Sequence, residues 1–250
     1  MCRFLGVVAD RPAPVSELLT GDLEPFLAMA CEHEHGWGVA YRDSHGAIRI
    51  TKEPERGDRS AKLRSLLDTC VTDMAVVHLR MASPGLPVHQ GNTHPFGDAR
   101  AAFLHNGDFN PRKILDTSID PDLLRTAEGD TDSERYYLAV RTLLDRGTPP
   151  AKAVARTAEE IRMLADAYVS LNCLLLTPSG LFAYNEHSPD SEVIQRRGAT
   201  YFDLYHRTEG GRLVIGSEGA LRPDAVSRQA PVGCVMEISA ENRDVVVHDV

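Results

Sequence analysis

The second residue of the chain is a cysteine, and removal of Met1 would make Cys2 the N-terminal residue. That one residue would then carry a thiol, which attacks as its thiolate, and a free α-amine that titrates at about 7.7–8.0. A nucleophile with a base on the same residue can attack an acyl group. Free cysteine is also common in protein cores, and for Cys2 taken alone, burial in a first strand is the favoured interpretation.

Two other chemically capable positions directly follow predicted strands. Arg80 follows the strand 74–79, and its planar guanidinium is suited to bidentate binding of a carboxylate. Asn106 and Gly107 follow the strand 101–105, where an amide side chain and a backbone N–H could form a two-donor oxyanion hole. Each has an ordinary alternative, because Arg80 could form a surface salt bridge and Asn-Gly is a frequent turn dipeptide.

An acidic segment opens the helix predicted over residues 131–146. Thr131 and Asp132 suit helix capping, and no further role is needed to explain them. As part of a site, however, Asp132 could bind an ammonium group. A nucleophile, a carboxylate clamp, an oxyanion hole and an acidic group together fit a substrate with an α-carboxylate, an α-ammonium and an attackable acyl group, such as glutamine or another γ-glutamyl amide.

The hydrophobic pattern predicts one domain over residues 1–250, with strands, then two helices, then more strands. This order favours an α+β fold of two sheets layered with helices over a parallel βαβ fold. Pro12 and Pro14 are expected to end the first strand, and Ser16 to cap the first short helix. The expected strands are 3–9, 37–41, 47–51, 74–79, 101–105, 171–177, 181–184, 201–207, 212–217, 234–238 and 245–247. The other expected helices are 24–31, 58–70, 131–146 and 151–165.

Composition excludes several classes of function. The formal net charge of −9 argues against nucleic acid or an anionic membrane as the main partner. Apolar runs are too short to span a bilayer, and the N-terminus does not resemble a signal peptide, so we expect a cytoplasmic protein. The five cysteines are odd in number and widely spaced, which favours free thiols.

No motif calls for a cofactor. Neither a Walker loop nor a G-x-G-x-x-G between a strand and a helix is present, and no C-x-x-C occurs. His33 and His35 could be read as a metal pair, but no second cluster lies at a matching spacing, so we interpret them as polar loop residues. We therefore expect neither a cofactor nor a metal.

Taken together, these motifs resemble the class II, or N-terminal nucleophile, glutamine amidotransferases, and most closely the single-domain YafJ/EgtC-type branch. They occur in the family's order, from residue 1 to about 220. The segments that carry the resemblance are Met1-Cys2-Arg3-Phe4-Leu5-Gly6, His35-Gly36-Trp37-Gly38, His78-Leu79-Arg80, Asn92-Thr93-His94-Pro95-Phe96, His105-Asn106-Gly107, Thr131-Asp132-Ser133-Glu134 and Ser217-Glu218.

The resemblance implies a four-layer αββα sandwich of two mainly antiparallel sheets. It implies that Cys2 is the nucleophile after Met1 is cleaved, with its own α-amine as the base. It further implies that Arg80, with Ser83 nearby, binds the glutamyl α-carboxylate. The remaining roles implied are an oxyanion hole for Asn106 and Gly107, and binding of the α-ammonium for Asp132.

The chain departs from the family's pattern at three positions. His35 replaces the aspartate common before Gly-Trp-Gly in this branch, while Met81 and Pro84 stand where synthase-linked members have an aromatic residue and a histidine. These differences concern the details of the pocket rather than the nucleophile. His94 is interpreted as a structural residue of a packed loop.

The expected activity is hydrolysis of a γ-glutamyl amide through a thioester on Cys2. Two alternatives stay open: a glutaminase subunit that supplies ammonia to a separate synthase, and a non-catalytic module that binds glutamine. A small γ-glutamyl compound is the expected partner, and a second copy of the chain would also be compatible with the sequence. Residues 83–98 and 186–200 are the candidates to line the leaving-group side.

Overall fold

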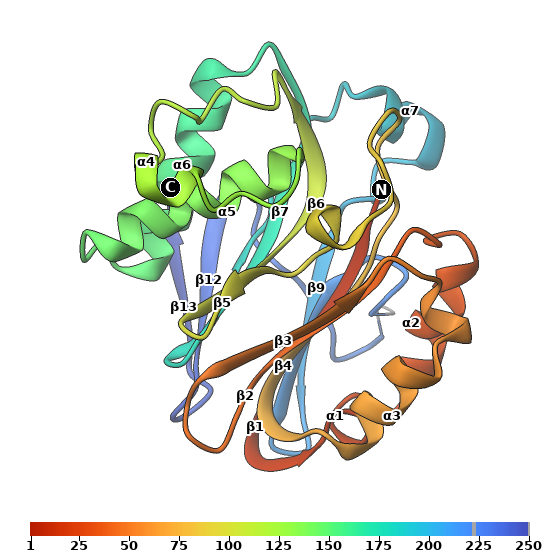
Figure 1. The fold of residues 1–250 in the computed structure, drawn as a ribbon. Helices are drawn as coiled ribbons and strands as arrows, with labels where there is room; N and C mark the ends of the chain where they lie inside the picture. Colours follow the sequence, from red (N-terminus) through yellow and green to blue (C-terminus); the bar gives the residue numbers. More distant parts are fainter. Residues whose placement is uncertain (222–223, 250) are drawn as a thin grey trace.

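Two antiparallel sheets are packed face to face in the computed structural model, which describes residues 1–221 and 224–249 (Figure 1). The first sheet has the strand order β11-β9-β10-β1-β4-β2-β3 and the second β13-β12-β8-β7-β6-β5. The strands of the first sheet are β1 Arg3–Pro14, β2 Trp37–Arg42, β3 Ile48–Glu53, β4 Val71–Leu79, β9 Leu204–Glu209, β10 Arg212–Ser217 and β11 Arg228–Gln229. Those of the second are β5 Phe96–Asp98, β6 Ala101–Asn110, β7 Ala167–Thr177, β8 Gly180–Tyr184, β12 Cys234–Ser239 and β13 Val245–Asp249.

Helices cover the outer face of each sheet (Figure 1). The first sheet carries α1 Val15–Leu18, α2 Leu23–Ala28 and α3 Ala61–Thr69. The second carries α4 Pro121–Leu124, α5 Asp132–Asp145 and α6 Pro150–Leu164, while α7 Glu192–Arg197 lies near the N-terminus. Three short 3₁₀ turns complete the list: η1 Met29–Cys31, η2 Gly57–Arg59 and η3 Gln90–Asn92. The four-layer αββα sandwich and the α+β class are thereby confirmed.

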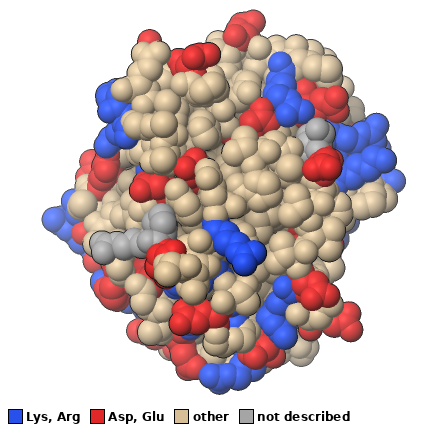
Figure 2. Space-filling view, turned by 180° about the vertical axis from the view of Figure 1, so that it is seen from behind, with Lys and Arg blue, Asp and Glu red and all other residues tan. Residues whose placement is uncertain are grey.

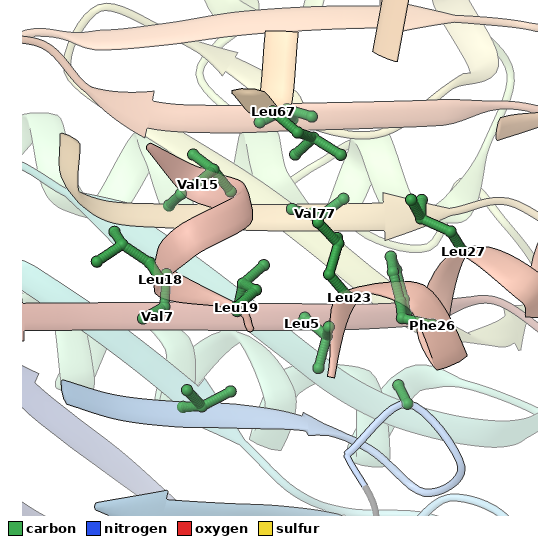
Figure 3. Packing of buried hydrophobic residues seen from close by; sticks show 14 of the residues in the cluster. Leu5, Val7, Val15, Leu18, Leu19, Leu23, Phe26, Leu27, Leu67 and Val77 are labelled. Atoms are coloured by element: carbon green, nitrogen blue, oxygen red, sulfur yellow. The ribbon is translucent and has the colours of Figure 1, made fainter. Parts of the chain in front are cut away.

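Side chains along β1 point alternately to its two faces, and this alternation shows why the layers form. Leu5 and Val7 face the outer helix layer, where they pack with residues of α1 and α2 (Figure 3). Phe4 and Val8 face the opposite way, into the core between the two sheets. Fully burying each such side chain contributes about 1.5–3 kcal/mol, so the strand is fixed in register by both of its faces.

The pairing of β1 with β4 brings the start of β1 beside the end of β4. β1 pairs with β4 in antiparallel register, with Arg3 opposite Leu79 and Phe4 opposite His78. The residue before β1 therefore lies beside the residue after β4, which places Cys2 next to Arg80. The same end of the sandwich receives Asn106 from β6, opposite Asn172 of β7.

Three local predictions are wrong. The first strand does not end at residue 9 but continues to Pro14, because its pairing with β4 shifts register between Val8 and Ala13 and then resumes. Helix α1 begins at Val15 after Pro14, and Ser16 is not its cap. Asn106 and Gly107 lie inside β6, which runs on to Asn110, rather than at a strand end or in a turn.

Some elements were not expected from the sequence: β5, β11, α4 and α7, all with six residues or fewer. Elements this short contain too little periodicity to detect. Among the described residues, none of the helices combines the length and apolar character that crossing a bilayer requires. Figure 2 shows acidic and basic side chains interspersed on the face seen from behind.

Candidate active site

Cys2 lies buried where β1 begins, with its thiol against the backbone of Met81. The Met81 N–H donates to Cys2 Sγ at 3.4 Å, and the thiol donates to the Met81 carbonyl at 3.6 Å. Burial raises the pKa of the Cys2 thiol, although the amino terminus, the Met81 N–H and Arg80 oppose the shift. The thiol is therefore neutral in this state, and a base must take its proton before it can attack.

Met1 occupies the position next to the thiol. Its amino group donates to Met81 Sδ at 2.8 Å, and burial lowers the pKa of that amine. While Met1 is present, the nitrogen of Cys2 is an amide and has no basicity. A base on Cys2 itself requires the removal of Met1.

Arg80 is a buried guanidinium with little to bind. Its side chain follows β4, is 2% exposed, and donates through Nη2 to the Pro87 carbonyl at 3.4 Å. Nη1 has no hydrogen-bond partner, and no carboxylate lies within ion-pair distance of Arg80 among the described residues. Burying an unpaired charge is costly, so this arrangement fits an anionic ligand that supplies the missing partner.

The side-chain amide of Asn106 has no hydrogen bond at all. Both its Nδ2 and Oδ1 atoms are buried without a partner among the described residues. Asn106 lies two residues along β6 from Leu104, on the face toward the first sheet. An orphaned buried amide of this kind is rare in folded proteins and indicates a group that awaits a ligand.

Gly107 is held against the neighbouring strand. A Cβ atom at this position would lie 1.7 Å from the Ser170 carbonyl and 2.5 Å from His105 Nε2, so only glycine fits. Gly107 lines the small cavity beside Cys2, and Asn106 is not among its lining residues. The two predicted oxyanion donors are therefore adjacent, but they occupy the middle of a strand.

Asp132 is the first residue of α5, which Thr131 caps through its side chain. Its Oδ2 accepts from the Phe109 N–H at 3.1 Å, which ties the start of α5 to β6. Burial, together with the nearby Asp108, raises the pKa of Asp132 to about 7. Among the described residues, no lysine or arginine lies within ion-pair distance of Asp132, and the nearest ring nitrogen, His105 Nδ1, is 3.8 Å from its Oδ2. The carboxyl is therefore suited to accept an ammonium.

These residues surround one cavity of about 20 Å³, roughly the space of a single water. Ser83 is part of its wall, as predicted for a residue near Arg80. A γ-glutamyl group would need more room than this cavity offers. The lining residues are Cys2, Arg80, Met81, Ala82, Ser83, Leu86, His94, His105, Gly107, Thr131, Asp132 and Ser133.

Three buried histidines lie at the site, and the sequence assigned none of them a chemical role. His94 is packed, as expected, with its ring 4.3 Å from that of His78, but it also lines the cavity. Burial lowers the pKa of His78 to about 3 and that of His94 well below its usual value, so both rings are neutral. His105 is fixed between Ser133, at 2.9 Å, and the Ser170 carbonyl, at 3.0 Å.

Cys2, His78 and His94 are also the residues best placed to hold a metal. One donor atom from each lies within 4.8 Å of the others, and their types are those that zinc prefers. The His33 and His35 pair does not form such a group. His33 lies in the loop between η1 and β2, as predicted, but it is buried, with its Nδ1 2.9 Å from the Met29 carbonyl oxygen. His35, in the same loop, accepts from the Ala82 N–H at 3.1 Å, a bond to the segment that lines the cavity.

Comparisons with known proteins identify the family of the chain. The sequence profile of the class II glutamine amidotransferases matches residues 1–204, and the chain belongs to that family. No match was found among curated protein sequences.

Solved structures share the fold at low sequence identity. A glutamine aminotransferase class-II domain protein from Silicibacter pomeroyi is 19% identical, with a TM-score of 0.71 over 99% of both chains. The glutamine phosphoribosylpyrophosphate amidotransferase from B. subtilis is 16% identical, with a TM-score of 0.63 over 99% of this chain and 49% of that one. A predicted glutamine amidotransferase from Pseudomonas aeruginosa is 18% identical, with a TM-score of 0.56 over 98% and 99%.

Proposed function

We propose that this protein hydrolyses the γ-glutamyl amide bond of glutamine or of a γ-glutamyl conjugate. The observation that carries the proposal is that the Cys2 thiol, the Arg80 guanidinium and the Asp132 carboxyl line one cavity, next to the strand position that holds the Asn106 amide. Arg80 Nη1 and the Asn106 amide are buried without a hydrogen-bond partner among the described residues, as groups that a γ-glutamyl ligand would satisfy. Membership of the class II amidotransferase family supports the handling of a glutamine amide.

Arg80 and Asp132 fix the acyl half of the substrate. The guanidinium binds the α-carboxylate through the Nη1 donor that has no partner in the free protein. The Asp132 carboxylate binds the α-ammonium, and the positive charge of the ligand lowers the pKa of Asp132 once bound. With both ends of the amino acid held, the γ-carbonyl extends toward Cys2.

The chemistry then has two stages. After Met1 is removed, the α-amine of Cys2 takes the proton of the thiol, and the thiolate attacks the γ-carbonyl carbon. Asn106 Nδ2 and the Gly107 N–H stabilise the oxyanion, the C–N bond breaks, and the amine leaves with a proton from the Cys2 α-ammonium. Water then attacks the γ-glutamyl thioester, which releases glutamate and restores the thiol.

Protein without Met1 is expected to release glutamate from at least one γ-glutamyl amide. A panel containing glutamine and γ-glutamyl amides of primary amines tests this, with glutamate and the released amine both quantified. Equal amounts of the two products indicate simple hydrolysis. The proposal would be wrong if the Met1-free protein released no glutamate from any member of the panel.

The pH dependence should show the titration of Asp132. Because the carboxyl binds the ammonium only when ionised and its pKa is about 7, KM should rise about tenfold per pH unit below pH 7. In the bound state this pKa is lowered, so Asp132 should leave kcat unaffected. Steady-state kinetics between pH 5 and 9 measure both constants.

The Asp132→Asn variant is the control for this titration. Its KM should be high at every pH and should no longer rise below pH 7, because the titrating group is gone. A wild-type KM that stays constant from pH 5 to 9 would contradict the role of Asp132.

A further inference from the structure

The side chain of Met1 fills an apolar space beside the nucleophile. It packs against a small cluster separate from the three main core clusters. The cluster is formed by Val169 in β7, by residues of α7 and by the segment before β9, and its members are Val169, Val193, Ile194, Tyr201 and Phe202. Removal of Met1 leaves this space without an occupant. We refer to it as the Met1 space.

A second buried guanidinium lies next to the Met1 space. Arg3 is 2% exposed, and its guanidinium lies 4.0 Å from the centre of the Tyr201 ring. Nη1 donates to the Cys2 carbonyl at 3.0 Å, but Nε has no partner, and no carboxylate lies within ion-pair distance among the described residues. Arg197, which also lies over the Tyr201 ring, is by contrast paired with Glu32. Arg3 is therefore the group near Tyr201 that lacks an anion.

In the proposed reaction, the leaving amine lies beside the α-nitrogen of Cys2, to which Met1 was bonded. The amine nitrogen departs with a proton from the Cys2 α-ammonium, so it must lie within hydrogen-bond distance of that nitrogen. Met1 is bonded to the same nitrogen. The substituent of the leaving amine and the former Met1 residue thus start from neighbouring nitrogen atoms, and Met1 shows that a group starting there extends into the Met1 space.

We propose that the substrate is a γ-glutamyl amino acid whose amino-acid part has an apolar side chain. The side chain occupies the Met1 space, and the carboxylate of the same residue binds Arg3. Methionine itself, which the protein's own first residue represents, is of suitable size and polarity. This inference rests on the proposed function and adds to it the class of the leaving group.

The bond changes are those of hydrolysis. The Cys2 Sγ bond to the γ-carbonyl carbon forms as the bond from that carbon to the amino acid's nitrogen breaks. The nitrogen gains a proton and leaves as the free amino acid. Water then cleaves the thioester, and no oxidant, reductant or metal takes part.

Four matched substrates test the proposal on Met1-free protein: γ-glutamyl-methionine, γ-glutamylglycine, γ-glutamyl-methioninamide and glutamine. The glycine compound lacks the apolar side chain, and kcat/KM should fall by roughly 10- to 200-fold relative to the methionine compound. The methioninamide compound lacks only the carboxylate charge, and kcat/KM should fall by roughly 10- to 150-fold. Glutamine lacks both groups and should be the poorest of the four.

Variants separate binding of the leaving group from general damage. Arg3→Gln should bring the ratio of the methionine to the methioninamide compound close to one, whatever happens to the absolute rates. Val193→Asp should reduce the ratio of the methionine to the glycine compound. Arg197→Gln, a neighbouring arginine that already has a partner, should leave both ratios unchanged.

The outcomes distinguish this inference from the proposed function. If glutamine is cleaved as well as γ-glutamyl-methionine, or if Arg3→Gln leaves the carboxylate ratio unchanged, the inference is wrong while γ-glutamyl hydrolysis stands. If none of the four compounds yields glutamate, and a glutamine-analogue diazo-ketone does not label Cys2, the proposed function itself is wrong.

Discussion

Replacement of Cys2 by alanine is expected to lower glutamate release by about 10⁴-fold or more, because no other group can form the thioester. The fold should survive the change. The thiol is buried at the start of β1, and its hydrogen bonds reach only the backbone of Met81. Turnover of the best γ-glutamyl substrate and the thermal unfolding midpoint, measured on the same preparation, check both parts of this prediction.

Cys31 provides a matched control. It is a free and exposed cysteine that is not among the residues lining the cavity, and Cys31→Ala should keep full activity. Unchanged turnover in Cys2→Ala would refute the assignment of the nucleophile. If Cys31→Ala lost activity while Cys2→Ala kept it, Cys2 would not be the nucleophile.

Asn106→Leu should separate catalysis from stability. Removal of one oxyanion donor lowers kcat by roughly 100- to 1,000-fold, and KM should change little because the donor acts on charge that develops in the transition state. The amide of Asn106 makes no hydrogen bond in the free protein. A leucine of similar volume breaks no bond, so the unfolding midpoint should stay the same or rise.

Asn172 is paired with Asn106 across β6 and β7, and Asn172→Leu is therefore a control with the same substitution at a neighbouring position. Its amide donates to the Phe202 carbonyl and accepts from the Glu186 N–H. Asn172→Leu should therefore destabilise the fold, by about 1–3 kcal/mol for each buried group left without a partner. If Asn106→Leu instead lowered the unfolding midpoint as much as Asn172→Leu and left kcat unchanged, Asn106 would be a structural residue.

Residue types, their order and the family resemblance indicated which side chains would lie together. Cys2, Arg80, Ser83, Gly107 and Asp132 do meet at one cavity. Local sequence patterns did not show why these five residues lie together in the fold. The pairing of β1 with β4 sets residue 2 beside residue 80 across 78 positions of sequence, and such long-range pairing follows from packing of the whole sheet.

The position of His94 at the cavity wall also could not be predicted from local sequence patterns. A Cβ atom on Gly38 would lie 2.0 Å from the His94 carbonyl oxygen. Because Gly38 of β2 has no side chain, the loop that contains His94 can approach the sheet. This approach brings His94 against His78 and to the cavity wall. Neither histidine carries a sequence signal for such contact. Similarly, the role of Met1 as the occupant of an apolar space depends on α7, a helix of six residues that the pattern did not predict.

The central claim is that Cys2, once it is the N-terminal residue, is the nucleophile. Intact-mass spectrometry of the purified protein, before and after exposure to a glutamine-analogue diazo-ketone, tests it most directly. We predict loss of Met1 and one covalent adduct, mapped to Cys2 by peptide sequencing and prevented by excess γ-glutamyl substrate. A protein that releases glutamate with Met1 still attached, or an adduct on another of the five cysteines, would contradict the claim.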